Sequence, residues 1–458
     1  MPRACRQPEW STWAHGSAPD MTDPTSPATE NPGSAESPEH SATPLLHPCN
    51  GVPPVAVTAN NIAEAAEFLS TGTGAFAVDA ERASGFRYSN RAYLIQIRRA
   101  GAGTVLIDPV SHGADSLAVL KPLAEVLSTD EWILHSADQD LPCLAEVGLR
   151  PPKLYDTELA SRLAGFERVN LATMVELLLG LGLVKGHGAA DWSKRPLPKE
   201  WLNYAALDVE VLIELKTAIA TVLAEQNKND WAAQEFEYLR TYEERPAAAR
   251  RERWRRTSGI HKVRDPRALA AIRELWTTRD QIAQRRDVAP RRILPDTAII
   301  DAAVADPKTI DELVALPVFG GRHQRRSANV WLKALETARN SGDRPDGSEP
   351  SSGPPPPARW GRRKPEAAAR LEAARSALSK VSQRVDVPVE NVLYPELLRR
   401  LCWDWDSIAA RQHDPLVAVG DFLAAGGARS WQRELVTAPL AAAMSSPLPP
   451  ADRANPTD

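Results

Sequence analysis

The stretch that decides the fold of this 458-residue chain is Gly-Ala-Phe-Ala-Val-Asp-Ala-Glu, at positions 74–81. Its apolar residues predict a buried strand that runs directly into two carboxylates, Asp79 and Glu81. Residues two apart in a strand project from the same face, so both carboxylates should leave the strand tip on one side. Adjacent like charges are costly unless a cation lies between them, and carboxylate oxygens are preferred ligands of hard divalent metals. Taken alone, the pattern also fits an acidic, solvated turn.

On both sides of this strand the pattern of apolar residues is that of an α/β domain. Three strands in hairpin order, followed by strands alternating with helices, predict a mixed sheet covered by helices. From Asp156 to about Leu223 the pattern is helical. The elements expected before that point are a helix at 60–69, strands at 92–97 and 104–107 joined by a glycine-rich turn, a helix at 117–127, a strand at 132–135 and a helix at 137–147.

Two helical blocks follow the α/β domain, and they share a weak internal echo. Asp287-Val288 precedes Ile293-Leu294 in the same way as Asp386-Val387 precedes Val392-Leu393, 99 positions later. The echo predicts a duplicated helical domain, although two Ala- and Arg-rich helices can also resemble each other by chance. The predicted segments are a disordered tail at 1–52, the α/β domain at 53–230, a basic helical connector at 231–264, the first helical domain at 265–340, a Pro/Ser/Gly-rich linker at 341–365, a second helical domain at 366–443 and a disordered tail at 444–458.

The composition limits the classes of function. The chain is 43% apolar and 25% charged and contains no run of 18 apolar residues, so we expect no membrane span. Its four cysteines are scattered, which argues against a disulfide framework or a zinc cluster and fits the reducing cytoplasm. Residues 250–340 hold 20 Lys and Arg against 11 Asp and Glu, a local charge of +9 that leaves −13 elsewhere. This asymmetry suits a metal site and a nucleic-acid-binding surface in one chain, and it also fits a merely solvated basic face.

Two further acids are candidate partners of Asp79 and Glu81. Asp140 falls in the first turn of the helix that follows the strand at 132–135, and α/β sheets place their sites at such strand ends. An acid at that position also suits the helix dipole. Asp208 lies four residues after Tyr204 among apolar neighbours, so the two share one helix face near a buried boundary. A buried, unpaired carboxylate is costly, and a metal would remove that cost, whereas an exposed acid would need no partner.

Together these motifs make residues 55–225 resemble the DEDD exonucleases, of ribonuclease H-like fold, and within them the bacterial ribonuclease D family. A tyrosine four residues before the last acid is typical of the DEDDy subgroup. Residues 265–340 resemble an HRDC domain through 293–296 and 309–313, and the second helical block resembles a diverged copy of it. The motifs that carry the exonuclease resemblance are Asp79-Ala80-Glu81 with the strand 93–97, His135 to Leu141, Asp156-Thr157, and Trp192 to Leu197 followed by Tyr204 to Asp208.

The resemblance implies a 3′→5′ exoribonuclease that acts in the cytoplasm on RNA 3′ ends, such as those of tRNA precursors. It implies two divalent ions, Mg²⁺ or Mn²⁺, and no organic cofactor. Asp79 would bridge both ions, and Tyr204 would orient the attacking water. The metal ligands would be Asp79, Glu81, Asp140 and Asp208, and the candidate substrate-binding residues are His135, Trp192 and Arg195.

Two alternatives use the same residues. A 3′→5′ DNA exonuclease would share the metal chemistry, because nothing in the sequence reads the 2′-hydroxyl that separates RNA from DNA. A non-catalytic RNA-binding scaffold is the other, and the complete set of acids argues against it.

Overall fold

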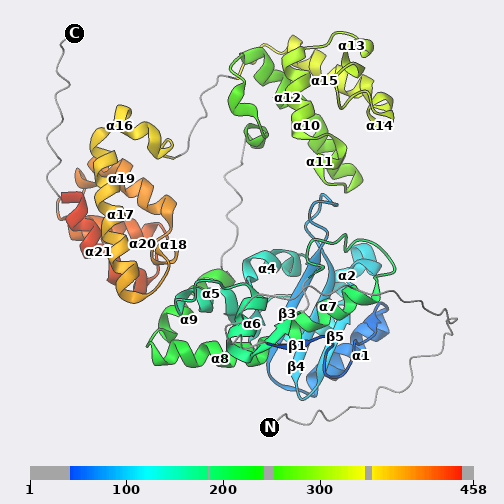
Figure 1. Ribbon diagram of the computed structural model, residues 1–458, viewed down its shortest axis with the longest axis vertical. Helices are drawn as coiled ribbons and strands as arrows, with labels where there is room; N and C mark the ends of the chain where they lie inside the picture. The colour runs from blue at the N-terminus through cyan, green and yellow to red at the C-terminus, as the bar shows by residue number, and fades with distance from the viewer. Residues whose placement is uncertain (1–41, 184–185, 242–251, 346–352, 446–458) are drawn as a thin grey trace, which may run out of the picture.

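A computed structural model of the chain describes residues 42–183, 186–241, 252–345 and 353–445 (Figure 1). These residues form one α/β domain and two helical domains. Of the predicted tails at 1–52 and 444–458, residues 1–41 and 446–458 lie outside the described residues. No helix in the described ranges is long and apolar enough to cross a membrane.

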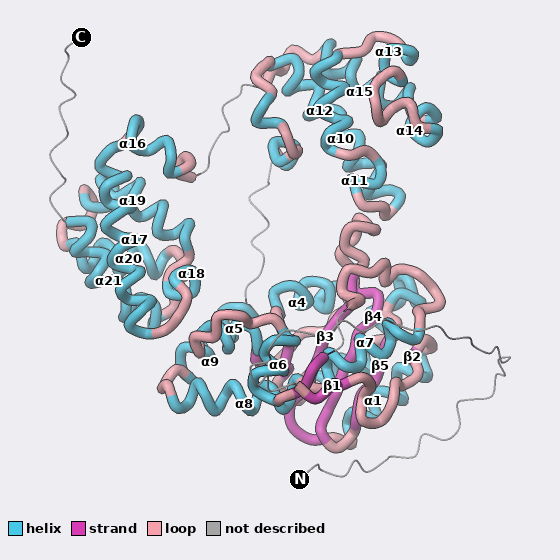
Figure 2. Tube along the Cα trace, in the orientation of Figure 1, coloured by secondary structure: helices cyan, strands magenta, loops and turns pink. Residues whose placement is uncertain are grey.

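A six-stranded mixed sheet forms the centre of the α/β domain (Figure 2), with strand order β2-β5-β4-β3-β6-β7. β3, β4 and β5 form an antiparallel meander, β6 and β7 extend it parallel to β3, and β2 lies parallel to β5. The predicted mixed sheet is therefore confirmed. The strands are β2 (Val55–Ala56), β3 (Thr73–Arg82), β4 (Ala92–Ala100), β5 (Gly103–Ile107), β6 (Trp132–Leu134) and β7 (Leu154–Asp156).

Helices cover both faces of this sheet, and most of them bury apolar residues. The first shows the pattern: Thr58 caps it by accepting the Asn61 amide, and Ile62, Ala65, Ala66 and Leu69 are buried. The helices of this domain are α1 (Ala59–Ser70), α2 (Ser116–Val119), α3 (Lys121–Leu127), α4 (Ala137–Glu146), α5 (Thr157–Leu163), α6 (Leu171–Leu179), α7 (Lys199–Glu210), α8 (Leu212–Glu225) and α9 (Asn229–Thr241).

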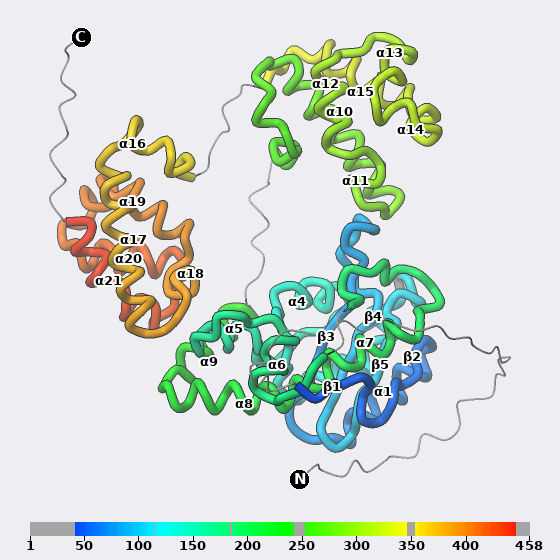
Figure 3. Tube along the Cα trace, in the orientation of Figure 1, coloured from blue at the N-terminus to red at the C-terminus, as the bar shows by residue number. Residues whose placement is uncertain are grey.

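A small two-stranded ribbon corrects two sequence predictions. β1 (Thr43–Leu45) lies inside the tail predicted as disordered, and β8 (Leu181–Leu183) lies inside a stretch predicted as helical. The two pair in parallel, so segments far apart in the sequence lie side by side (Figure 3). Neither strand has a periodic pattern of its own in the sequence. Each pairs with the other strand, and a local pattern does not reveal such pairing.

The first helical domain, residues 252–345, has its own apolar core. Part of the predicted connector at 231–264 belongs to it, since Trp254 is buried in that core, whereas α9 packs on the α/β domain. Its helices are α10 (Pro266–Arg286), α11 (Pro290–Ile293), α12 (Asp296–Ala305), α13 (Ile310–Val314), α14 (Arg322–Arg326) and α15 (Ala328–Asn340).

The second helical domain, residues 353–445, begins earlier than predicted. The segment expected to end a linker at residue 365 contains Trp360, which is fully buried with its ring 5.0 Å from that of Trp403. The prolines around Trp360 dominate the composition of this segment, so the sequence predicted a linker and missed the buried tryptophan. Its helices are α16 (Trp360–Arg363), α17 (Pro365–Val385), α18 (Val389–Val392), α19 (Pro395–Ala409), α20 (Pro415–Ala425) and α21 (Ser430–Ser445).

Candidate active site

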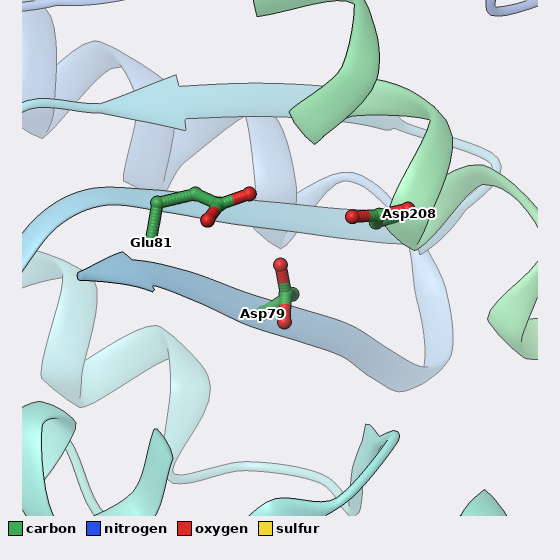
Figure 4. Close-up of side chains that lie close together, drawn as sticks. All are labelled: Asp79, Glu81 and Asp208. Carbon is green, nitrogen blue, oxygen red and sulfur yellow. The ribbon is translucent and has the colours of Figure 1, made fainter. Parts of the chain in front are cut away.

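Three of the predicted acids meet at the centre of the α/β domain. Asp79 and Glu81 project from β3 and Asp208 from α7, and their side chains point toward one another (Figure 4). One oxygen of each lies within 4.8 Å of the others. The alternation of β3 places the first two, with buried Ala80 between them on the opposite face. α7 packs across β3, β4 and β5, and this packing brings Asp208 to the strand.

Asp140, the fourth acid, stands in the first turn of α4 and lines the same cavity of about 440 Å³. It is buried, and its Oδ1 has no hydrogen-bond partner. Asp156 fixes the start of α4, because its carboxylate accepts the backbone amides of Ser136 and Ala137. The Asp-Thr element found in the sequence therefore serves to position Asp140.

The electrostatics of this cluster favour a bound cation. Burial raises the pKa of all four carboxyls, and the charge of Asp79 raises the pKa of Glu81, Asp140 and Asp208 further. Hard oxygen ligands that repel one another, with one buried oxygen lacking a hydrogen bond, fit a divalent metal site. The donor set therefore suits Mg²⁺ or Mn²⁺, and it contains no soft ligand.

Tyr204 lies one helical turn before Asp208, as predicted. Burial raises the pKa of its phenol well above the usual value, and the neighbouring charges of Asp208 and Glu81 raise it further. The hydroxyl therefore stays protonated at neutral pH, where it can donate a hydrogen bond but cannot act as a base. Gly188 leaves room beside it, since a Cβ there would lie 3.4 Å from the Tyr204 hydroxyl oxygen.

Comparisons with known proteins agree with this geometry. The 3′-5′ exonuclease family matches residues 55–224, the HRDC domain matches 268–335, and the 3′ to 5′ exonuclease C-terminal domain matches 353–444. The ribonuclease D of Nitrobacter hamburgensis is 32% identical over 219 residues, which are 46% of this chain and 55% of that protein. The chain is therefore similar to the ribonucleases D.

Solved structures give the same fold. A crystal structure of a protein from Bifidobacterium adolescentis is 36% identical, with a TM-score of 0.77, and covers 88% of this chain and 100% of that one. Escherichia coli RNase D, described as an exoribonuclease involved in structured RNA processing, has a TM-score of 0.58 at 24% identity, covering 77% of this chain and 91% of that one. At that identity the likeness shows the shared fold. The matched part spans little more than half the length of the ribonucleases D with which the sequence aligns.

The three candidate substrate-binding residues occupy different positions. His135 lines the cavity, its Nδ1 lies 2.9 Å from Thr157 Oγ1, and burial lowers its pKa to about 4. Trp192 and Arg195 are absent from the residues that line the cavity. Trp192 is fully buried against Trp201, with ring centroids 5.2 Å apart.

Arg195 serves the fold in the same region. Its guanidinium pairs with the buried Asp108 at 2.7 Å and donates to the carbonyl oxygens of Tyr93 and Trp192. The predicted substrate contacts of Trp192 and Arg195 are thus not supported by their positions. The motif they share holds the turn that leads into α7, and through α7 it positions Tyr204 and Asp208.

Two residues at the site escaped the sequence analysis. Gln96 is fully buried opposite Asp79 in the β3–β4 ladder, and its Nε2 donates to Asp79 Oδ2 at 2.6 Å. This bond orients Asp79 without neutralising its charge. Arg82, directly after Glu81, lies 3.4 Å from Asp140. A polar residue within the otherwise apolar run 92–97 was the available signal for Gln96.

Proposed function

We propose that the protein is a 3′→5′ exoribonuclease that hydrolyses phosphodiester bonds at RNA 3′ ends and releases nucleoside 5′-monophosphates. Structured RNAs such as tRNA precursors are the proposed substrates, in the cytoplasm. The observation that carries the proposal is the convergence of Asp79, Glu81 and Asp208 from β3 and α7, with Asp140 in the same cavity. Similarity to the ribonucleases D supports the choice of RNA.

Two divalent ions would supply a metal-activated water and stabilise the charge on the leaving oxygen. Asp79, Glu81 and Asp208 would hold the ion on the side of the nucleophile, and Asp79 with Asp140 would hold the other. Gln96 keeps the Asp79 carboxylate oriented between these positions. Tyr204, protonated at neutral pH, would orient the attacking water by hydrogen bonding.

A degradation assay tests the reaction. A 3′-extended RNA and a DNA of the same sequence are incubated with Mg²⁺, with Mn²⁺ and with EDTA. We expect RNA to be shortened from its 3′ end only in the presence of metal. Faster cleavage of DNA would favour the alternative of a DNA exonuclease, and full activity in EDTA would remove the metal sites from the mechanism.

Substitutions separate catalysis from scaffolding. Asp208→Asn should slow RNA hydrolysis at least ~100-fold, because a ligand lost beside the reacting phosphate removes several kcal/mol of charge stabilisation. Asp138→Asn is the matched control, since Asp138 is exposed and does not line the cavity that Asp140 lines. A parent protein that binds RNA but never shortens it would support the scaffold alternative.

Tyr204→Phe tests the positioning of the water. It removes the hydroxyl and keeps the ring that packs beside Trp192, with centroids 6.5 Å apart. We expect turnover to fall strongly while RNA affinity and metal affinity stay the same. A rate within about twofold of the parent, roughly 0.4 kcal/mol, would mean that Tyr204 serves packing alone.

The HRDC domain is the proposed RNA-binding surface, because exposed arginines stand on α14 and around α11. Replacing Arg322, Arg325 and Arg326 by Gln should weaken binding of long RNA and flatten its dependence on salt, since fewer counterions are released. Hydrolysis of dinucleotides should stay unchanged. An unaltered salt slope would assign this surface to another partner.

A further inference from the structure

Arg82 is the last residue of β3, immediately after the catalytic pair Asp79 and Glu81. Among the described residues that line the active-site cavity it is the one arginine or lysine. The β3–β4 ladder is irregular between Glu81 and Arg82, which releases Arg82 from the strict alternation of the strand. A permanent positive charge thus stands at the mouth of the acidic site.

The contacts of Arg82 anchor it on α4. Its Nη1 donates to the main-chain oxygen of Gln139, and its Nη2 donates to Gln139 Oε1 at 3.2 Å. The same Nη2 lies 3.4 Å from Asp140 Oδ1, an oxygen that has no hydrogen bond. The guanidinium is therefore held by Gln139, while its tie to Asp140 is a loose, purely electrostatic one. Asp140 could take a metal without Arg82 leaving its place.

The positive charge of Arg82 repels a metal cation and attracts a phosphate. It repels any divalent cation at Asp140, because the two like charges would share one carboxylate. The side chain is 21% exposed and lines the cavity, so a phosphate that enters there can pair with the guanidinium.

We propose that Arg82 couples the binding of a nucleotide phosphate to the binding of the metal at Asp140. An RNA phosphate that pairs with Arg82 cancels the repulsion, so the ion at Asp140 binds tightly only together with substrate. Coupling of this kind is reciprocal, since metal at Asp140 must then also tighten phosphate binding. The proposal rests on the proposed two-metal function of the same site.

The test is a Mn²⁺ titration of the full chain at pH 8, followed by calorimetry, with and without adenosine 5′-monophosphate. This nucleotide carries the phosphate of the proposed product and is not itself hydrolysed. Arg82→Met keeps most of the aliphatic stem and removes the charge, and Arg82→Lys keeps a charge but loses the guanidinium fork. Arg91→Met is the matched control, because Arg91 is exposed at the end of the loop that follows Arg82 and does not line the cavity.

In the parent we expect the nucleotide to raise the affinity of the weaker Mn²⁺ site about tenfold or more, within the usual range of coupling between sites. In Arg82→Met that site should bind Mn²⁺ more tightly than the same site of the parent when nucleotide is absent. The nucleotide should then change its Mn²⁺ affinity by less than about threefold. Arg82→Lys should retain weak Mn²⁺ binding and lose part of the coupling. Arg91→Met should behave as the parent.

Equal Mn²⁺ affinity and equal coupling in Arg82→Met and the parent would overturn the inference and leave Arg82 as an anchor of α4. That outcome differs from failure of the proposed function, in which the parent itself would bind no Mn²⁺ and shorten no RNA. If Arg82→Met melts at a lower temperature than the parent, Arg82→Lys decides between the two hypotheses. The proposal predicts that this variant loses part of the coupling between nucleotide and Mn²⁺. A role of Arg82 as an anchor of α4 alone predicts the same coupling as in the parent.

Discussion

The HRDC domain and the C-terminal domain share one local frame and are attached to the exonuclease domain in opposite ways. Each contains a 21-residue helix, α10 or α17, that ends at an aspartate in the left-handed region, Asp287 or Asp386. A four-residue helix follows in both, α11 or α18, and the next residue is extended. Corresponding positions lie 99 residues apart, so the internal echo in the sequence has a structural counterpart.

The attachments differ in chemistry. The HRDC domain contacts the β3–β4 loop and the start of β4 mainly through polar groups, chiefly Asp287, which accepts the Ser89 amide at 2.8 Å and the Tyr93 hydroxyl at 3.3 Å. Tyr88 of the loop also packs on the HRDC core. The core of the C-terminal domain is continuous with that of the exonuclease domain. There Trp431 stacks on Trp231 with ring centroids 4.9 Å apart and an interplanar angle of 16°.

This difference assigns the two domains different mechanical roles. Burial of apolar surface is the larger source of stability, so the C-terminal domain should melt with the exonuclease domain as one body. A polar interface of a few hydrogen bonds is worth little net free energy, so the HRDC domain should open and close on its loop. That loop begins directly after Arg82, so the HRDC domain docks on the segment that leaves the candidate active site.

The largest expected effect comes from removing a buried tryptophan in each domain. Trp431→Ala deletes an indole that also donates to Glu235 Oε1 at 2.8 Å, and we expect a cost of about 3–5 kcal/mol. Trp331→Ala, its HRDC counterpart, deletes an equally buried indole that donates to Gln324 Oε1. In calorimetry, Trp431→Ala should lower the melting temperature of the exonuclease domain by on the order of 10 °C. Trp331→Ala should lower the melting temperature of the HRDC domain alone. A shift of the exonuclease transition by both would contradict the comparison.

A pair of glycines gives a smaller and sharper effect. Gly165 and Gly85 both have positive φ, at +87° and +83°, and both lie at domain contacts. A Cβ on Gly165 would lie 2.3 Å from Asp386 Oδ2 and 3.0 Å from the Asp386 main-chain oxygen, whereas a Cβ on Gly85 meets nothing within 4 Å. Either substitution by Ala adds a backbone strain of roughly 1–2 kcal/mol.

Gly165→Ala must in addition displace the Asp386 side chain and shift the Asp386 backbone in the C-terminal domain, which adds about 1–3 kcal/mol. Urea unfolding of the two variants measures the difference, because the strain is common to both. Equal midpoints would mean that Asp386 moves aside without cost and that the C-terminal domain is attached less firmly than its shared core implies.

Local patterns made most of the site predictable. The alternation of Asp79 and Glu81, and the one-turn spacing of Tyr204 and Asp208, are properties of one strand and one helix, so the sequence determines them directly. Arg82 opposite Asp140 depends on the packing of α4 against β3, which no local pattern encodes. For the same reason Arg195 looked like a substrate ligand, since its partner Asp108 lies 87 positions away in the sequence.

The smallest effect concerns the titration of Asp287. Burial alone would raise the pKa of Asp287, but hydrogen bonds from Ser89 and Tyr93 and the charge of Arg91 outweigh it, so the pKa of this carboxyl is lowered from 3.8. A carboxyl whose pKa is lower in the docked state than in the undocked state stabilises docking at pH values above its undocked pKa. That stabilisation is lost as the pH falls through the docked pKa. The HRDC domain should therefore be held at neutral pH and released in acid.

Asp287→Asn keeps an acceptor oxygen and removes the charge. Because hydrogen bonds to a charged acceptor are stronger than neutral ones, docking should weaken at pH 7 by about 1 kcal/mol, and this contribution should no longer vary with pH. Hydrogen exchange of the Ser89 amide measures docking directly, because that amide donates to Asp287 Oδ1. We expect its protection, corrected for intrinsic exchange, to fall about fivefold in Asp287→Asn.

Asp386→Asn is the control, since Lys228 donates to the main-chain oxygen of Asp386 and the tryptophan stack remains. Unchanged protection in Asp287→Asn would show that the other contacts of the loop hold the HRDC domain without the charge of Asp287.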